Sequence, residues 1–216
     1  MPGAVLWDLD GTIVDSEEYH WLSWRDTISA EGVSITYEQF LASFGQRNDA
    51  IIPSWLPEAT PRQIQLIGDA KEVEFRRLVR ERGLSSLPGV AHWVEHLHQN
   101  AWPQAIASSA PRANVEAILE TLGLGKYFRA VVTAADVKRG KPEPDVFLAA
   151  AERLGVEAAR CIVVEDAAPG VEAARRAGMR SVGVSRNTAK LSAADIVVAS
   201  LQDLPPDAFD RLAGES

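Results

Sequence analysis

The sequence lacks the features that mark several protein classes. A single cysteine, Cys161, stands among 216 residues, so no disulfide can form within the chain. No apolar run approaches the roughly 20 residues of a membrane-spanning helix, and no basic segment with a small-residue cleavage site follows Met1. These absences lead us to expect a cytoplasmic protein with no membrane partner.

Positive charge is also scarce, because 22 Lys and Arg residues stand against 30 Asp and Glu residues and leave a net charge of -8. Nucleic acids require a basic protein surface that neutralises their phosphates, so we expect no nucleic-acid partner. A monomer is the expected state. An acidic protein that binds a phosphate must gather positive charge locally.

Short apolar runs alternate with helical stretches along most of the chain. The runs have the length of buried strands and cover residues 4–7, 104–107, 130–133, 161–164, 181–184 and 196–198. Helical stretches at 114–122, 143–154 and 170–177 are each followed by a glycine, which favours a helix end. The pattern predicts an α/β fold, a doubly wound and mostly parallel sheet with a Rossmann-like core. Ligands of such sheets bind beyond the carboxyl ends of the strands.

Residues 16–87 interrupt the alternation. They carry helical periodicity, for example at Ile64, Ile67, Val73, Phe75 and Leu78, and show no convincing strand. We therefore predict two domains, a core of residues 1–15 and 88–216 and a helical insert of residues 16–87.

The sequence Asp8-Leu9-Asp10-Gly11-Thr12 follows the first apolar run. Carboxylates two residues apart face the same side of an extended chain, so one could attack a substrate while the other handles protons. An aspartate that attacks phosphorus forms an aspartyl-phosphate and divides one slow displacement into two easier steps. The simpler alternative is that Asp-Gly only marks a turn.

Candidate phosphate ligands follow two later segments. Ser108 and Ser109 come directly after the 104–107 run and before Pro111, where a hydroxyl and backbone N–H groups could bind a phosphate oxygen. Prolines next to Lys141 would fix that lysine at a helix start, as a point charge for phosphate. The alternatives are a helix cap at the two serines and a solvated surface position for Lys141.

Glu165 and Asp166 come directly after the 161–164 run. Two carboxylates at such a place are costly unless a cation is present. Mg²⁺ prefers oxygen ligands, so we expect Mg²⁺ as the cofactor, with an ordinary surface turn as the alternative.

These motifs, in this order and each at a strand end, resemble those of the haloacid dehalogenase superfamily of phosphotransferases over nearly the whole chain. The resemblance implies that Asp8 is the nucleophile and Asp10 the general acid/base. It also implies that Ser108 and Lys141 bind the transferring phosphoryl group.

The same resemblance implies the ligands of the metal. Asp166 would bind Mg²⁺ directly beside Asp8 and the backbone carbonyl of Asp10, and Glu165 would lie next to the ion.

The insert resembles the small α-helical cap of the beta-phosphoglucomutase-like branch, which also includes many sugar-phosphate phosphatases. By this resemblance His20 would lie over the site, and Arg47 and Lys71 would match cap residues that contact the substrate; solvated surface side chains are the alternative. Tryptophans of the insert could stack on a sugar ring, although their spacing favours the insert's own core. They are Trp21, Trp24 and Trp55.

Two further patterns have simpler explanations. The segment from His92 to His96 matches an inverted zinc-peptidase motif, but no third zinc ligand accompanies it. Gly123-Leu124-Gly125 begins a dinucleotide-binding fingerprint but lacks its third glycine and follows a helix, so we interpret it as a helix stop.

Three functions remain open. The first is a phosphatase of a small phosphorylated metabolite, with a sugar phosphate expected, and the second is a beta-phosphoglucomutase-type phosphomutase. The third, remote alternative is a phospho-acceptor receiver module, which needs no insert after its first strand. By resemblance Thr12 favours a hydrolase, and Ala110 and Pro111 replace the Ser-Lys pair that holds a mutase's second phosphate, although Arg112 could compensate.

Overall fold

The computed structural model describes residues 3–43, 46 and 48–214. The chain divides into two compact units, one built from the residues up to Asp15 and from Ser85 onward, the other from Ser16–Leu84. That residues 16–87 form a domain of their own remains a prediction, because independent folding is a stronger property than compactness. Within the described ranges, no helix has the length and apolar character needed to cross a membrane.

The first unit is built on a six-stranded sheet with the order β3-β2-β1-β4-β5-β6. Each pair of neighbouring strands is parallel, so the predicted α/β fold is confirmed, with a wholly parallel sheet where a mostly parallel one was expected. The strands are β1 (Ala4–Trp7), β2 (Gln104–Ala107), β3 (Ala130–Val132), β4 (Cys161–Glu165), β5 (Arg180–Val184) and β6 (Ile196–Val198).

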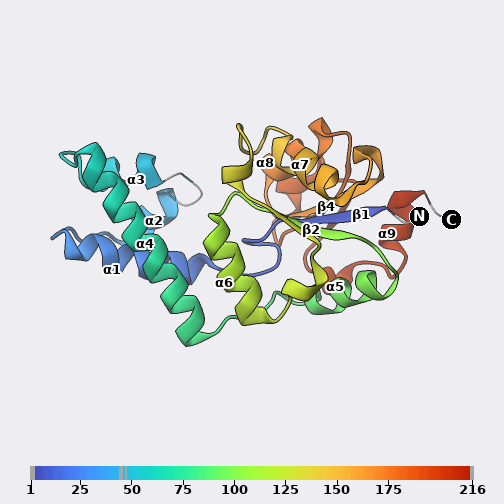
Figure 1. The fold of residues 1–216 in the computed structure, drawn as a ribbon, viewed down its shortest axis with the longest axis horizontal. Coiled ribbons are helices and arrows are strands. Elements are labelled where there is room, and N and C mark those ends of the chain that lie inside the picture. The colour runs from blue at the N-terminus through green and yellow to red at the C-terminus, as the bar shows by residue number, and fades with distance from the viewer. Residues whose placement is uncertain (1–2, 44–45, 47, 215–216) are drawn as a thin grey trace. The chain divides into compact units, whose positions relative to one another are not determined.

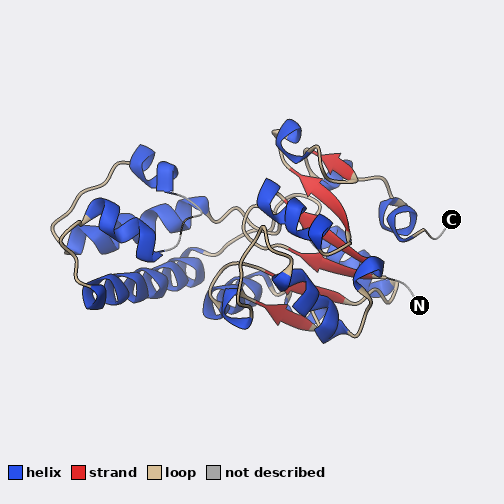
Figure 2. Cartoon of the chain, turned by 90° about the horizontal axis from the view of Figure 1, so that it is seen from above, coloured by secondary structure: helices blue, strands red, loops and turns tan. Residues whose placement is uncertain are grey.

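Helices cover both faces of this sheet (Figures 1 and 2). They are α5 (Val90–Gln99), α6 (Arg112–Leu122), α7 (Asp145–Leu154), α8 (Ala168–Arg176) and α9 (Ala208–Ala213). Figure 1 shows α7 and α8 on one face and α5, α6 and α9 on the other. The helices α6 and α7 begin directly after Pro111 and Pro144, which take the N-cap positions. Gly123, at φ 66°, ends α6 as the predicted helix stop.

The strands are apolar on both sides because both faces of the sheet are covered. On one face Leu6 and Val163 belong to a buried cluster that also includes Phe147 of α7. On the other face the buried amide of Gln104 accepts from the Trp7 indole N–H at 3.0 Å and donates to the Val94 carbonyl of α5 at 2.9 Å. Strand β1 is thereby fixed from both sides, and with it the loop that follows.

The described residues of the second unit form helices and no strand. They are α1 (Glu17–Ala30), α2 (Tyr37–Ser43), α3 (Asn48–Trp55) and α4 (Pro61–Arg82). Thr60 starts α4 with a capping box that pairs it with Gln63, and Pro61 follows at the first helical position.

One face of α4 is buried and carries Ile67, Lys71, Phe75 and Leu78 at helical spacing. Val73 was expected on this face but is 59% exposed, because it lies two positions from both Lys71 and Phe75 and so points away. Lys71 therefore lies between apolar residues on the buried face of α4.

The three tryptophans pack in the insert's own apolar cluster, as their spacing favoured. Trp24 belongs to the buried core, and Trp21 and Trp55 are partly buried and pack against it. Trp24 is buried and meets Trp55 edge to face at 5.2 Å between ring centroids, and Trp21 lies 5.7 Å from Phe40. These rings hold α1 against α2 and α3.

Candidate active site

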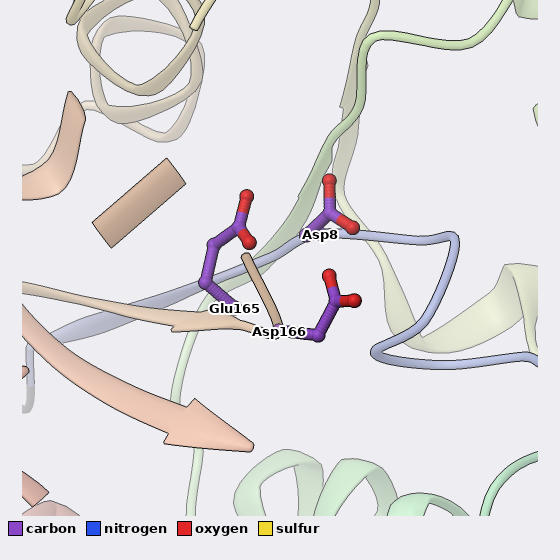
Figure 3. A group of neighbouring side chains, drawn as sticks. All are labelled: Asp8, Glu165 and Asp166. Atoms are coloured by element: carbon purple, nitrogen blue, oxygen red, sulfur yellow. The ribbon is translucent and has the colours of Figure 1, made fainter. Parts of the chain in front are cut away.

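Carboxylates gather at the carboxyl ends of two neighbouring strands. Asp8 follows the last residue of β1, and its N–H donates to the Val164 carbonyl of β4 at 3.0 Å. Glu165 ends β4 and Asp166 follows it. Figure 3 shows the three carboxyl groups directed toward a common space. Adjacent parallel strands end at the same edge, so two segments far apart in the sequence, at Asp8 and at Asp166, meet here.

Lys141 bridges two of these carboxylates. Its Nζ donates to Asp8 Oδ1 at 2.5 Å and to Glu165 Oε1 at 2.6 Å, and it lies 4.9 Å from the centroid of the Phe147 ring. Its side chain is only 9% exposed. The alternative of a solvated surface lysine therefore does not describe this residue.

The cluster has more negative than positive charge. Burial, together with the charge of Glu165, raises the pKa of Asp166 to about 7 and raises the pKa of Asp8 well above its ordinary value. Burial disfavours the ammonium of Lys141, but the charges of Asp8 and Glu165 outweigh that effect and raise its pKa. Three carboxylates against one lysine leave an excess of negative charge that a cation would neutralise.

A divalent cation fits the side chains at this edge. Among the described residues, Asp8, Glu165 and Asp166 offer ligand oxygens that all lie within 4.8 Å of one another. Carboxylate oxygens are hard ligands and suit a hard cation such as Mg²⁺. Glu165 also accepts the Ala167 N–H at 2.9 Å through Oε2, so the backbone fixes its orientation.

Two glycines leave room for these carboxylates. A Cβ on Gly11 would lie 2.1 Å from Asp166 Oδ2, and Gly11 also has a φ of +84°, which other residues rarely adopt. A Cβ on Gly170, in the first turn of α8, would lie 1.7 Å from Glu165 Oε1. The sequence predicted Gly170 only as the start of a helix, and the one signal of its role is that it follows two carboxylates closely.

Asp10 lies beyond β1, in the turn closed by the hydrogen bond from Gly11 N–H to the Val14 carbonyl. It is partly exposed, and its charge adds to the raised pKa of Asp166. It is therefore a neighbour of the cluster, while its side chain is outside the group of converging ligand oxygens found among the described residues.

Ser108 follows β2, the neighbour of β1 on the side opposite β4. It is buried, its N–H donates to the Val132 carbonyl, and its hydroxyl accepts the Ala110 N–H at 3.0 Å. The hydroxyl thus closes a turn within the loop. It does not cap α6, because Pro111 is the N-cap of that helix and has no side-chain cap hydrogen bond. Ser109 beside it is exposed. The phosphate-binding roles of both serines stay predictions.

The predicted substrate residues of the insert lie in the second unit. Lys71 Nζ is 2.9 Å from His20 Nδ1 and 3.1 Å from Glu72 Oε1, and the His20 ring stacks on Phe75. Arg47 lies outside the described residues. Whether these side chains contact a substrate stays a prediction.

Comparison with known proteins finds matches over most of the chain. A family model described as haloacid dehalogenase-like hydrolase matches residues 2–178. The chain is 35% identical to fructose-1-phosphate phosphatase YqaB of Escherichia coli, over 84% of this chain and 95% of that protein. It is 32% identical to beta-phosphoglucomutase of Bacillus subtilis, over 93% of this chain and 91% of that one.

Among solved structures, beta-phosphoglucomutase of Clostridium difficile is similar with a TM-score of 0.85 and 26% identity. The match covers 100% of this chain and 98% of that one.

Proposed function

This chain belongs to the haloacid dehalogenase-like hydrolase family, and from that membership we propose that Asp8 is the nucleophile of a phosphatase acting on a small phosphorylated metabolite. The observation that carries the proposal is the pairing of Lys141 Nζ with Asp8 Oδ1 beside two further carboxylates at one edge of the sheet. The enzyme is a phosphoric monoester hydrolase, the class in which its phosphatase relative falls.

In the first step an Asp8 oxygen attacks phosphorus, and the bond from phosphorus to the ester oxygen breaks. Lys141 fixes Oδ1 and so orients the carboxylate for attack by its second oxygen. Asp10 donates a proton to the departing alcohol. The products are the alcohol and an aspartyl-phosphate on Asp8.

In the second step Asp10 takes a proton from water while that water attacks the same phosphorus. The bond from phosphorus to Asp8 breaks, inorganic phosphate leaves and both aspartates return to their starting state. Lys141 and Ser108 are the proposed ligands of the phosphoryl oxygens, since an ammonium and a loop of N–H groups suit the charge on the transferring group.

We propose that Mg²⁺ is held by Asp8, Asp166 and Glu165, with the backbone carbonyl of Asp10 as a further ligand. A divalent cation supplies positive charge that offsets the repulsion between the carboxylates and an incoming phosphate. The excess negative charge and the converging oxygens of the cluster support this assignment.

A sugar phosphate is the proposed substrate class, because the relative at 35% identity is a phosphatase of fructose 1-phosphate. A phosphomutase remains the second candidate, because another relative is a beta-phosphoglucomutase. The chain itself favours hydrolysis. Ala110 and Pro111 offer neither hydroxyl nor ammonium for a second phosphate, and the guanidinium of Arg112 is already bound to Asp136 and the Val131 carbonyl.

A panel of phosphorylated metabolites with Mg²⁺ tests the proposal by phosphate release. We expect turnover of one or more sugar phosphates, and a flat response to the whole panel would contradict it. To separate the two candidates, beta-glucose 1-phosphate is incubated with a trace of the bisphosphate. Glucose 6-phosphate that accumulates well ahead of free phosphate would identify a mutase instead.

A further inference from the structure

An aspartate outside the carboxylate cluster joins three segments near the carboxyl edge of the sheet. Asp136 Oδ2 accepts the N–H of Thr133 at 2.8 Å, its hydroxyl at 2.8 Å and Nη2 of Arg112 at 2.8 Å. Oδ1 accepts Nη2 of Arg153 at 2.7 Å. Both carboxylate oxygens therefore bind a guanidinium, and Arg153 and Thr133 hold the pKa of Asp136 well below its ordinary value.

The two arginines also bind one backbone carbonyl. Arg112 Nη2 donates to Val131 O at 3.1 Å and Arg153 Nη1 donates to the same oxygen at 2.5 Å. Strand β3 is an edge strand of the sheet, so one side of its backbone has no strand partner. The guanidiniums satisfy this carbonyl and tie α6 and α7 to the edge strand.

The position of β3 matters for the predicted phosphate-binding loop. The N–H of Ser108 donates to the Val132 carbonyl at 3.0 Å, so a shift of β3 moves the backbone of Ser108. Arg112 is the first residue of α6 and follows the 108–111 loop directly. The loop is therefore held at one end by β3 and at the other by Arg112, and Asp136 fixes both.

Asp136 also precedes the segment that carries Lys141. It closes the short 3-10 turn Ala134–Asp136 through its bonds to Thr133, and Lys141 follows five residues later, before α7. Arg153 of α7 returns to Asp136. The same carboxylate thus sits between the two segments that supply the proposed phosphate ligands.

We propose that Asp136 is a positioning residue that holds the 108–111 loop and the Lys141 segment in place through Arg112 and Arg153. This inference rests on the proposed phosphatase function for its effect on rate. A displacement of about 1 Å in a group that positions a substrate can lower the rate about a hundredfold. Asp136 can therefore affect turnover without touching the substrate.

Asp195 provides a matched control. Its Oδ1 accepts Arg180 Nη1 at 2.7 Å and its Oδ2 accepts the Ser181 N–H at 2.8 Å. Like Asp136 it binds an arginine and a backbone N–H. However, it holds the start of β5, at the amino edge of the sheet, away from the proposed site.

The experiment compares Asp136→Asn and Asp195→Asn with the unchanged protein, using p-nitrophenyl phosphate with Mg²⁺. We expect Asp136→Asn to lower kcat roughly ten- to a hundredfold with a much smaller change in KM. The variant would still bind the substrate, but the phosphate ligands would no longer be aligned with it. Asp195→Asn should keep kcat within about twofold. Arg112→Lys keeps the positive charge but loses the planar guanidinium, so it should lower kcat less than Asp136→Asn does. It replaces Asp136→Asn in the test if that variant does not fold.

Amide hydrogen exchange supplies a readout that does not depend on turnover. The N–H groups of residues 108–110 and of residue 112 should exchange faster in Asp136→Asn, and in Arg112→Lys, than in Asp195→Asn. Unchanged exchange there, or equal kcat in the Asp136 and Asp195 variants, would overturn the positioning role. If the unchanged protein releases no phosphate from any ester, the proposed function fails, and exchange alone then decides the positioning role.

Discussion

Lys141 of the first unit and Lys71 of the insert keep only 9% and 3% of their side chains exposed, yet their surroundings differ. Lys141 binds Asp8 and Glu165, which come from the ends of two different strands, with Asp166 close by. Lys71 binds its sequence neighbour Glu72 and the ring nitrogen of His20 on α1.

Burial does not distinguish the two lysines, but the balance of charge around them does. Lys71 and Glu72 balance each other's charge, and Asn48 Nδ2 binds the same Glu72 oxygen at 2.8 Å, so the group joins α1, α3 and α4. Around Lys141 the carboxylates outnumber the ammonium, and that excess opposes folding unless a ligand neutralises it. An unbalanced buried cluster is the stronger sign of a binding site.

The largest effect should come from removing the nucleophile from the unbalanced cluster. Asp8→Asn should lower turnover by at least about a thousandfold, because amide oxygen is a poor nucleophile. The fold should persist, since Lys141 keeps Glu165 and one repelling charge is gone. Phosphate release and thermal unfolding measure both effects. If the variant keeps more than about a tenth of wild-type turnover, the covalent mechanism is wrong.

Metal removal comes next, because it acts on the excess charge itself. Exhaustive chelation should abolish turnover, and added Mg²⁺ should restore it. Ca²⁺ should restore little, since its larger and looser shell would misplace Asp8. Phosphate release is measured before and after dialysis against chelator, with buffer alone as the control. Full activity in the chelated enzyme would show that turnover does not require a metal ion.

Substituting each lysine tests the comparison itself. Lys141→Met should lower kcat/KM about a hundredfold or more, because it removes the ammonium that orients Asp8. Lys71→Met should mainly lower stability, by about 2 kcal/mol, since the partly buried carboxylate of Glu72 loses its cation.

The paired measurements are kcat/KM and denaturant unfolding of each variant. A fall in kcat/KM for Lys71→Met as large as that for Lys141→Met would show that the insert lysine acts on the substrate, as the family resemblance implies.

The smallest effects should come from replacing a helical glycine with alanine, at Gly170 and at Gly68. In Gly170→Ala the new Cβ must displace Glu165, and with it Lys141, so we expect roughly a tenfold loss of kcat. In Gly68→Ala of α4 the Cβ meets Asn48 at an ordinary 3.5 Å, so the helix should gain up to about 1 kcal/mol. Steady-state kinetics and unfolding curves distinguish them. Equal effects at both sites would mean that Glu165 can move without consequence.

The sequence predicted the parts of the site that depend on strand ends. Apolar runs followed by Asp8, Ser108 and Glu165 were enough to predict that these residues lie at one edge of the sheet, because parallel strands end there together. The predicted helix at 114–122 began two residues late, since Arg112 and Ala113 carry no apolar periodicity.

The contacts of Asp136 depend on Arg112 and Arg153, which lie 24 and 17 positions away, so no local pattern indicates them. Only the spacing of Thr133 and Asp136, typical of a capping box, could have been noticed.

The central claim is that phosphate passes through Asp8, and the Asp10→Asn variant tests it most directly. With p-nitrophenyl phosphate the leaving group needs little protonation, so the first step should proceed while the second, which needs a base, slows. We predict a burst of one p-nitrophenol per enzyme, and after acid quench a peptide heavier by one phosphoryl group at Asp8. Release of p-nitrophenol with no burst and no label on Asp8 would contradict the account.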